Sequence, residues 1–217
     1  MSIEKRTSIS RTARYFFSSE PSSIQPYLCF VLHGYGQLPQ YFLRKFERLE
    51  RDDILFVAPE GLHRFYLNGS KGRVGASWMT KEDRLQDIDD YVRALDKMAA
   101  EVTNGRNFKK VVVLGFSQGV ATACRWVALG QQSFQHLINW AGAFPPDLDF
   151  KKAHQLLATL PIEILVGKQD EFISESTFKQ HLEHLKEQGL NYRGHVFEGK
   201  HEIYHEPLKK LFATVFS

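Results

Sequence analysis

Residues 115–119, Gly-Phe-Ser-Gln-Gly, fit the pattern G-x-S-x-G, which places a serine on a sharp turn between a strand and a helix. A serine hydroxyl is a weak nucleophile near pH 7, so it needs a base within hydrogen-bond reach and a third group that orients the base. The pattern therefore predicts Ser117 as the nucleophile of an acyl-transfer reaction. The alternative is that the two glycines only make a tight turn.

A candidate acid and a candidate base follow Ser117 in the chain. The apolar run Ile162–Val166 is followed by Asp170, and the run Tyr192–Phe197 is followed by His201. In α/β-hydrolases the three groups occur in the order serine, acid, histidine, with each one after a strand. We therefore expect Asp170 to orient the imidazole of His201, which takes the proton of the nucleophile.

Other side chains could compete for these two roles. Glu171 is chemically able to act as the acid, but its side chain is expected to leave the loop in a different direction from that of Asp170. The competing histidines fall inside predicted helices or strands, or precede no suitable strand end: His136, His154, His181, His184 and His195. The sequence therefore favours Asp170 and His201.

The oxyanion of a tetrahedral intermediate needs preorganised N–H donors. One typically comes from the residue after the nucleophile and one from the loop after an early strand, which here indicates Gln118 and Tyr35. His33, which precedes that early loop, is interpreted as a residue that braces the loop and not as a second base. The alternative for the loop is a simple glycine turn.

Residues 201–205, His-Glu-Ile-Tyr-His, also match the zinc-protease pattern H-E-x-x-H. Zinc binding by this pattern requires both histidines on one face of a continuous helix, and a third protein ligand. Gly199 just before the pattern and Pro207 just after it make such a helix doubtful. A zinc hydrolase is therefore the remote alternative, and no metal or other cofactor is expected.

Short apolar runs alternate with longer helical patterns along the chain, which is typical of a mostly parallel, doubly wound α/β sheet flanked by helices. The polar, glycine-bearing segment Gly61–Gly75 is predicted to be a long loop. Strands are predicted at Ala13–Phe17, Tyr27–Leu32, Ile54–Ala58, Val111–Leu114, Leu137–Ala141, Ile162–Val166 and Tyr192–Phe197. Helices are predicted at Pro39–Glu50, Lys81–Val102, Gly119–Leu129, Ser174–Lys186 and Glu206–Phe216.

The composition indicates one domain over residues 1–217, because a chain of 217 residues that is 43% hydrophobic can bury one sizeable core. The net charge of +3 without a basic tract argues against nucleic acid as a partner. The sequence has no integral membrane segment and no secretory signal, so we expect a cytoplasmic protein that is a monomer or a homodimer. Cys29 and Cys124 are expected to be small buried hydrophobes.

The chain resembles the phospholipase/carboxylesterase family of α/β-hydrolases, which includes acyl-protein thioesterases and small bacterial esterases. The resemblance rests on residues 32–36, 58–61, 77–78, 115–119, 167–170 and 199–203. It implies an α/β-hydrolase fold, and the chain is close to the bare size of that fold, so no lid domain is expected. It also implies that Trp78 packs against the substrate, with a buried structural tryptophan as the alternative. Lys200 stands where family members often carry a glycine, which predicts a more cationic pocket rim.

These observations together predict a serine hydrolase that cleaves carboxylic esters of small molecules through an acyl-enzyme, as a carboxylesterase or a lysophospholipase-like enzyme. An acyl-thioesterase or an acyltransferase could use the same triad of Ser117, Asp170 and His201. A catalytically idle binding module of the same fold is a further alternative, which the complete set of three residues argues against.

Overall fold

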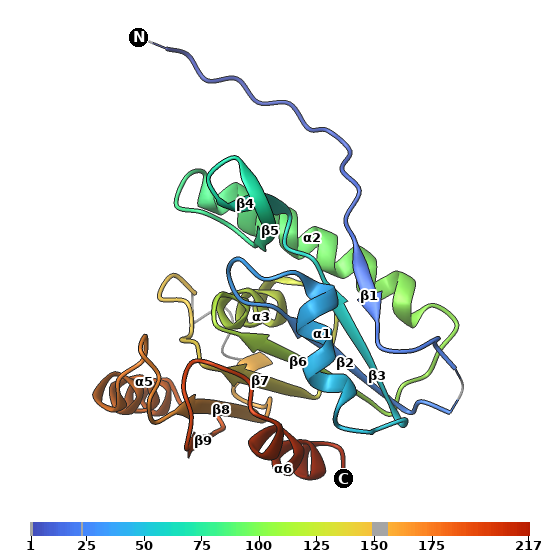
Figure 1. Cartoon of the computed structure of the whole chain (residues 1–217), viewed down its shortest axis with the longest axis vertical. Coiled ribbons are helices and arrows are strands. Elements are labelled where there is room, and N and C mark those ends of the chain that lie inside the picture. The colour runs from blue at the N-terminus through green and yellow to red at the C-terminus, as the bar shows by residue number, and fades with distance from the viewer. Residues whose placement is uncertain (1, 23, 149–155) are drawn as a thin grey trace.

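The computed structural model describes residues 2–22, 24–148 and 156–217. Its centre is a seven-stranded sheet with the strand order β1-β3-β2-β6-β7-β8-β9 (Figure 1). The edge strand β1 is antiparallel to β3, and the other strand pairs are parallel. The strands are β1 (Tyr15–Phe17), β2 (Tyr27–Leu32), β3 (Ile54–Pro59), β6 (Lys110–Phe116), β7 (His136–Trp140), β8 (Ile162–Gly167) and β9 (Tyr192–Phe197).

Helices cover both faces of this sheet (Figure 1). On one face the buried residues of α2 (Arg84–Thr103), α3 (Gln118–Leu129) and α5 (Glu175–Glu187) share a hydrophobic core with the sheet. On the other face α1 (Pro39–Glu47) and α6 (His205–Val215) share a second core. The mostly parallel, doubly wound plan predicted from the sequence is confirmed.

Strand β2 shows why these runs are apolar at every position. Leu28, Phe30 and Leu32 contribute to the core on the side of α2 and α3. Cys29 and Val31 contribute to the core on the side of α1 and α6. A parallel strand that is covered on both faces has no polar face, so its sequence is a continuous apolar run. Cys29 and Cys124 are both buried free thiols, as predicted.

The strand order of the sheet reverses at β2. This strand pairs with β3 on one side and with β6 on the other, so the loops that leave β2 and β6 diverge. In open α/β sheets, ligands bind outside the carboxyl ends of the strands at such a switch point. The loops after β2 and β6 are the ones predicted to hold the oxyanion donors and the nucleophile.

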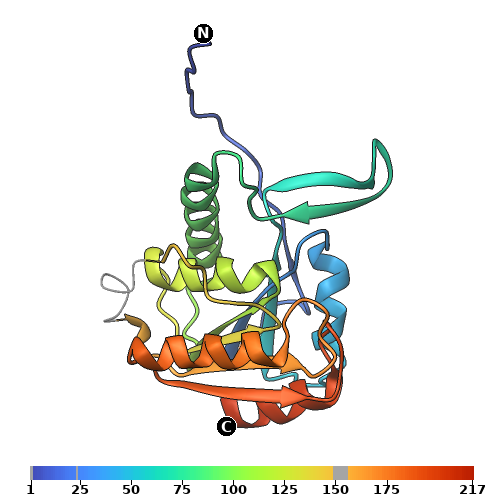
Figure 2. The same ribbon diagram turned by 90° about the vertical axis from the view of Figure 1, so that its left-hand side faces the viewer.

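The prediction of a long loop over Gly61–Gly75 is wrong. Strands β4 (His63–Asn68) and β5 (Lys71–Ser77) form an antiparallel hairpin that projects from the main body (Figure 2). Most of its outer residues are exposed on both faces, so the hairpin lacks the alternation of apolar and polar residues that marks a half-buried strand. The two residues Gly69 and Ser70 connect its strands, which is a common hairpin length.

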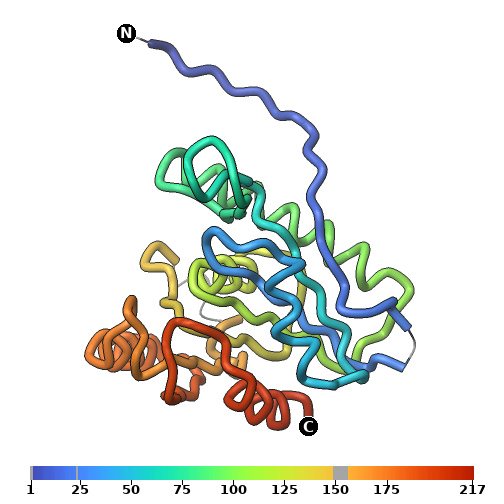
Figure 3. Tube along the Cα trace, viewed as in Figure 1, coloured from blue at the N-terminus to red at the C-terminus, as the bar shows by residue number. Residues whose placement is uncertain are grey.

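Other element boundaries agree closely with the sequence. Strands β2 and β9 have the predicted bounds, and α2 is the longest of the described helices at 20 residues. Strand β6 continues through Gly115 to Phe116, one residue before the predicted nucleophile. Before β1, the described residues 2–14 form an extended segment that leads away from the sheet (Figure 3). Among the helices that the structure describes, none is both long enough and apolar enough to cross a bilayer.

Candidate active site

Ser117 lies between β6 and α3 in a strained backbone conformation, with φ 54° and ψ −117°. A serine held in this sparsely populated region indicates a position that the surrounding fold enforces. The strand and the helix approach so closely here that a Cβ atom at Gly115 would overlap the carbonyl of Gly119. A Cβ at Gly119 would overlap the carbonyl of Leu32. The two glycines of the pattern are therefore required by the packing of strand against helix.

Asp170 and His201 meet at the carboxyl ends of neighbouring strands β8 and β9. The Oδ2 atom of Asp170 lies 2.8 Å from Nδ1 of His201, and the Asp170 side chain is fully buried. The other carboxylate oxygen of Asp170 accepts hydrogen bonds from the backbone N–H groups of Phe172 and Ile173 at 2.9 and 3.0 Å. These bonds hold the carboxylate in one orientation. The adjacent Glu171 is exposed.

The imidazole of His201 is held between two aromatic rings. Its centroid lies 5.1 Å from that of Phe116 and 4.6 Å from that of Phe172. Phe116 directly precedes Ser117, so this packing brings the histidine loop to the serine turn. Within the described residues, Ser117 Oγ has no hydrogen bond, and Nδ1 of His201 contacts Asp170. In ligand-free structures, catalytic hydrogen bonds are often long.

The loop after β2 is held from both sides. The backbone N–H of Gly36 donates to the carbonyl of Ala76 at 2.9 Å, and the N–H of Ala76 donates to the carbonyl of Gln37 at 3.0 Å. These bonds join the loop to strand β5 of the hairpin. Within the described part of the chain, the backbone N–H groups of Tyr35 and Gln118 have no acceptor. Two donors near the nucleophile turn therefore remain available to a ligand.

His33 braces this loop from below, as predicted. It is completely buried, and its Nε2 accepts the N–H of Gly61 at 3.0 Å while Nδ1 lies 2.8 Å from the carbonyl of Gly34. Burial lowers the pKa of His33 to about 4, although the bond to Gly34 and the nearby Glu60 raise it. A neutral imidazole can donate through one nitrogen and accept through the other, and His33 uses both.

The phospholipase/carboxylesterase family matches residues 17–215 of the chain. The chain belongs to the phospholipase/carboxylesterase family. It is an α/β-hydrolase, and solved structures share its fold. An acyl-protein thioesterase 2 from Zea mays is 17% identical with a TM-score of 0.73, covering 94% of this chain and 98% of that one.

Two esterases have the same fold. Esterase PE8 is 22% identical with a TM-score of 0.69, and the match covers 94% of this chain and 97% of that one. A carboxylesterase from Bacillus cereus is 16% identical with a TM-score of 0.66, covering 94% of this chain and 95% of that one. The fold class and the family resemblance read from the sequence are both confirmed.

In this phospholipase/carboxylesterase family member Trp78 is a core residue with 1% of its surface exposed. Its indole N–H donates to the carbonyl of His33 at 2.8 Å, and its ring stacks on the imidazole of His33 with centroids 5.0 Å apart. This environment favours the buried structural tryptophan over the substrate contact that the family resemblance implies.

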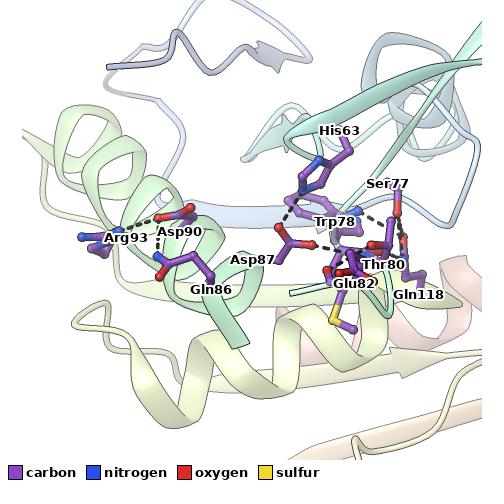
Figure 4. Close-up of polar contacts among 11 residues, drawn as sticks. His63, Ser77, Trp78, Thr80, Glu82, Gln86, Asp87, Asp90, Arg93 and Gln118 are labelled. Atoms are coloured by element: carbon purple, nitrogen blue, oxygen red, sulfur yellow. Dashed lines mark hydrogen bonds and ion pairs between the residues drawn. The ribbon is translucent and has the colours of Figure 1, made fainter. Parts of the chain in front are cut away.

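The side chain of Gln118 makes contacts that the sequence analysis missed (Figure 4). Its Oε1 accepts the N–H of Trp78 at 3.2 Å, and its Nε2 donates to the carbonyl of Met79 at 3.0 Å and to Ser77 Oγ at 3.0 Å. The residue after the nucleophile thereby ties the segment after β5 to the serine turn. No local sequence pattern predicts this pairing, because Gln118 and Trp78 are forty residues apart.

The base of the hairpin is also tied to α2 (Figure 4). Nε2 of His63 in β4 lies 3.1 Å from one carboxylate oxygen of Asp87, and the other oxygen accepts the N–H of Thr80 at 3.2 Å. A single carboxylate on α2 therefore connects the start of β4 with the segment that follows β5. The hairpin is anchored at its base and exposed at its turn.

The zinc-protease pattern does not form the helix that such a site requires. Helix α6 begins at His205, and His201 lies on the preceding turn, where it contacts Asp170. Nε2 of His205 lies 3.0 Å from the carbonyl of Arg48, on a different part of the surface. Across residues 2–22, 24–148 and 156–217, no group of three or more His, Cys, Asp or Glu side chains is arranged to hold a metal ion.

The other competing histidines lie elsewhere. His136 and His195 both contact Glu163 on the α6 face of the sheet, and Nε2 of His181 accepts the N–H of Phe144 at 3.1 Å. His184 lies on α5, and His154 is outside the described residues. Among the described histidines, His201 is the one that pairs with a buried carboxylate at the carboxyl ends of the strands.

Proposed function

We propose that this chain hydrolyses carboxylic esters through an acyl-enzyme formed on Ser117. In this proposal His201 is the general base, Asp170 orients its imidazole, and the backbone N–H groups of Tyr35 and Gln118 stabilise the oxyanion. The observation that carries the proposal is the hydrogen bond between Asp170 and His201 at the strand ends beside the strained serine turn. The family to which the chain belongs supports hydrolytic chemistry at this turn.

The reaction divides into two acyl transfers. His201 Nε2 takes the proton of the Ser117 hydroxyl, and the serine oxygen forms a bond to the ester carbonyl carbon. The negative charge moves to the carbonyl oxygen, where two N–H groups stabilise it. The tetrahedral intermediate collapses as His201 gives its proton to the departing alcohol. Water, activated by the same imidazole, then attacks the acyl-enzyme and releases the acid.

Asp170 stays ionised throughout this cycle. Its carboxylate keeps the Nδ1–H of His201 pointing toward the protein, which leaves Nε2 free to accept the serine proton. The two backbone N–H groups that donate to Asp170 stabilise its negative charge at a buried position. The acid therefore acts by orientation and charge and does not transfer a proton.

The identity of the leaving group separates this proposal from its alternatives. A thioester substrate or an alcohol acceptor would use the same residues, and one solved structure with this fold is an acyl-protein thioesterase. Oxoester and thioester substrates with the same acyl group, compared by kcat/KM, separate an esterase from a thioesterase. Product analysis in the presence of an added alcohol separates hydrolysis from acyl transfer to that alcohol.

Covalent labelling tests the nucleophile. A fluorophosphonate probe is expected to label the wild-type protein and the Ser133→Ala variant, whose substitution lies at an exposed position in the loop between α3 and β7. The Ser117→Ala variant is expected to lose the label and to lose activity on p-nitrophenyl esters by roughly 10⁴-fold or more. Retained hydrolysis in Ser117→Ala would remove the proposal. Activity lost on prolonged chelation would instead favour the zinc alternative.

The remaining expectations from the sequence belong to the same proposal. Residues 1–217 are treated as one domain that acts on small-molecule esters, and a cytoplasmic protein that is a monomer or a homodimer is expected. Trp78 as a substrate contact stays a prediction, which Trp78→Phe tests. No cofactor takes part in the proposed reaction, because the serine, histidine and aspartate supply every group that moves a proton or forms a bond.

A further inference from the structure

A groove of about 540 Å³ lies beside the predicted oxyanion loop. Its walls come from residues 36–38 of that loop, from α1 and from the β4–β5 hairpin. Neither the family pattern nor the proposed catalytic residues assign a role to it. The hairpin that forms one wall lies in the segment for which the sequence predicts a long loop.

The groove lies next to the proposed reaction centre. Gly36, one of its lining residues, directly follows Tyr35, whose N–H is a proposed oxyanion donor. Phe42 of α1 also lines the groove, and the centroid of this ring is 5.9 Å from that of Phe116, the residue before Ser117. A molecule in the groove would therefore lie beside the ester that the serine attacks.

The position of Lys45 indicates which part of an ester the groove receives. Lys45 lines the groove, and its Nζ lies 3.8 Å from a carboxylate oxygen of Glu202, the residue after His201. The groove is thus on the histidine side of the nucleophile. The departing alcohol must also lie on that side, because the imidazole gives it a proton. The groove is therefore placed to receive the alcohol portion of the ester.

The lining of the groove is apolar and cationic. Tyr41, Leu67 and Val74 are exposed apolar residues on its walls, with 56%, 40% and 36% of their surfaces accessible. Lys45 and Arg73 are its charged residues, and none of the groove residues is acidic. Within the described part of the chain, Arg73 makes no ion pair, in contrast to Arg64 of the same hairpin, which pairs with Glu60.

The charged side chains of the hairpin itself are all basic. Residues 61–76 contain Arg64, Lys71 and Arg73 and neither Asp nor Glu. A cleft lined by one sign of charge with low-dielectric walls concentrates ligands of the opposite sign. A guanidinium without an ion-pair partner can also bind a carboxylate or a phosphate through two parallel hydrogen bonds. The groove therefore fits a ligand with an apolar chain that ends in an anionic group.

We propose that this groove binds the alcohol portion of the substrate ester, and that this portion carries an anionic group that pairs with Arg73. The apolar walls contact its apolar chain, and Lys45 adds to the positive potential. This inference rests on the proposed esterase function, because it assigns the leaving group of that reaction. It defines the substrate class as esters of alcohols that bear a carboxylate, phosphate or similar anion.

The test uses butanoyl esters of ω-hydroxyalkanoic acids, with the primary amides of the same acids as uncharged controls. Acids of four to eight carbons vary the distance between the ester and the carboxylate while the acyl group stays constant. The amide has nearly the same size, and the methylene spacer keeps the leaving alcohol nearly equal in acidity. At the best chain length, kcat/KM is expected to be roughly tenfold higher for the carboxylate than for the amide.

Two variants distinguish a direct contact between Arg73 and the anionic group from a general electrostatic attraction by the hairpin. Arg73→Gln is expected to lower kcat/KM for the carboxylate to the value for the amide, which removes the preference. Lys71→Gln removes the same charge near the turn of the same hairpin and is expected to keep most of the preference. Added salt is expected to reduce the preference in the wild type, because the cations are exposed to solvent.

Other outcomes would overturn the inference. Equal kcat/KM for carboxylate and amide at every chain length would show that the groove does not recognise the negative charge. Equal losses in Arg73→Gln and Lys71→Gln would assign the effect to the whole hairpin, as expected of a surface that attracts an anionic membrane. The esterase proposal itself fails only if Ser117→Ala still hydrolyses the uncharged amide-bearing esters, so the two failures are distinguishable.

Discussion

The carboxylate of Asp170 lies 2.8 Å from Nδ1 of His201 and is completely buried. In Asp170→Asn, the amide oxygen can still accept from Phe172 and Ile173, so the amide nitrogen faces the imidazole. A donor in that position forces the proton of His201 onto Nε2, which can no longer accept from serine. We expect kcat on p-nitrophenyl butanoate to fall by about 10⁴-fold, as in other serine triads.

Glu171→Gln is the matched control for this prediction, because Glu171 is adjacent and exposed. Its kcat is expected to stay within a factor of two or so of the wild-type value. Thermal unfolding of both variants checks that the fold is retained. Wild-type activity in Asp170→Asn, or an equal loss in Glu171→Gln, would contradict the assigned role of Asp170.

Gly75→Ala tests the connection between the hairpin and the oxyanion loop. A Cβ atom at Gly75 would overlap the carbonyl of Gly36, which follows the proposed donor Tyr35. The loop must shift to relieve this overlap, and the Tyr35 N–H shifts with it. Loss of one oxyanion donor typically costs about 10²-fold in kcat, so we expect a loss of roughly that size with a smaller change in KM.

Ser70→Ala at the turn of the same hairpin is the control for Gly75→Ala, because it changes no contact with the loop. Steady-state kinetics and thermal unfolding are measured for both variants. If Gly75→Ala lowers stability and leaves kcat unchanged, the loop does not carry an oxyanion donor.

Trp78→Phe distinguishes a core residue from a substrate contact. The substitution leaves the carbonyl of His33 without its indole donor, which is expected to lower the free energy of unfolding by about 1–3 kcal/mol. Because Trp78 is buried, kcat/KM should change by the same factor for butanoate and decanoate esters. A factor that grows with acyl chain length would show that the ring contacts the acyl group.

Because of Glu163, the free energy of unfolding is expected to depend on pH in the acidic range. Burial raises the pKa of this β8 carboxylate, but hydrogen bonds from His136 and His195 and the charge of Arg193 outweigh it and lower the pKa from 4.5 to about 2. As the pH falls below about 4.5, the unfolded chain takes up the proton first, so stability decreases between pH 4.5 and 2. Above pH 4.5 the ionised carboxylate of Glu163 contributes its full stabilisation of the folded state.

Urea unfolding at pH 7, 4 and 3 measures this effect. Glu163→Gln is expected to be less stable than the wild type at pH 7 and to lose less stability on acidification, with a maximum difference in slope of about 1.4 kcal/mol per pH unit. Glu183→Gln, at an exposed position on α5, is the control and is expected to follow the wild type. Parallel curves for wild type and Glu163→Gln would contradict the assigned pKa.

Several features were predictable from the sequence because their signals are local. Strand β2 is covered on both faces and is a continuous apolar run, so the sequence predicts it with its observed bounds. The bounds of β9 are also predicted correctly, although it is an edge strand with exposed residues. The order of Ser117, Asp170 and His201, each after a predicted strand, predicts the contact between the last two. Gly199 and Pro207 correctly argued against a helix through His201.

Tertiary structure alone decided how the hairpin and the loops surround the serine turn. The bond from Gly36 to Ala76 and the bonds from Gln118 to Trp78 and Met79 join segments about forty residues apart. Such pairings depend on the path of the chain and leave no periodic pattern. The hairpin is exposed on both faces, so hydrophobic periodicity could not reveal it, and the groove beside Arg73 exists only because the hairpin stands against α1.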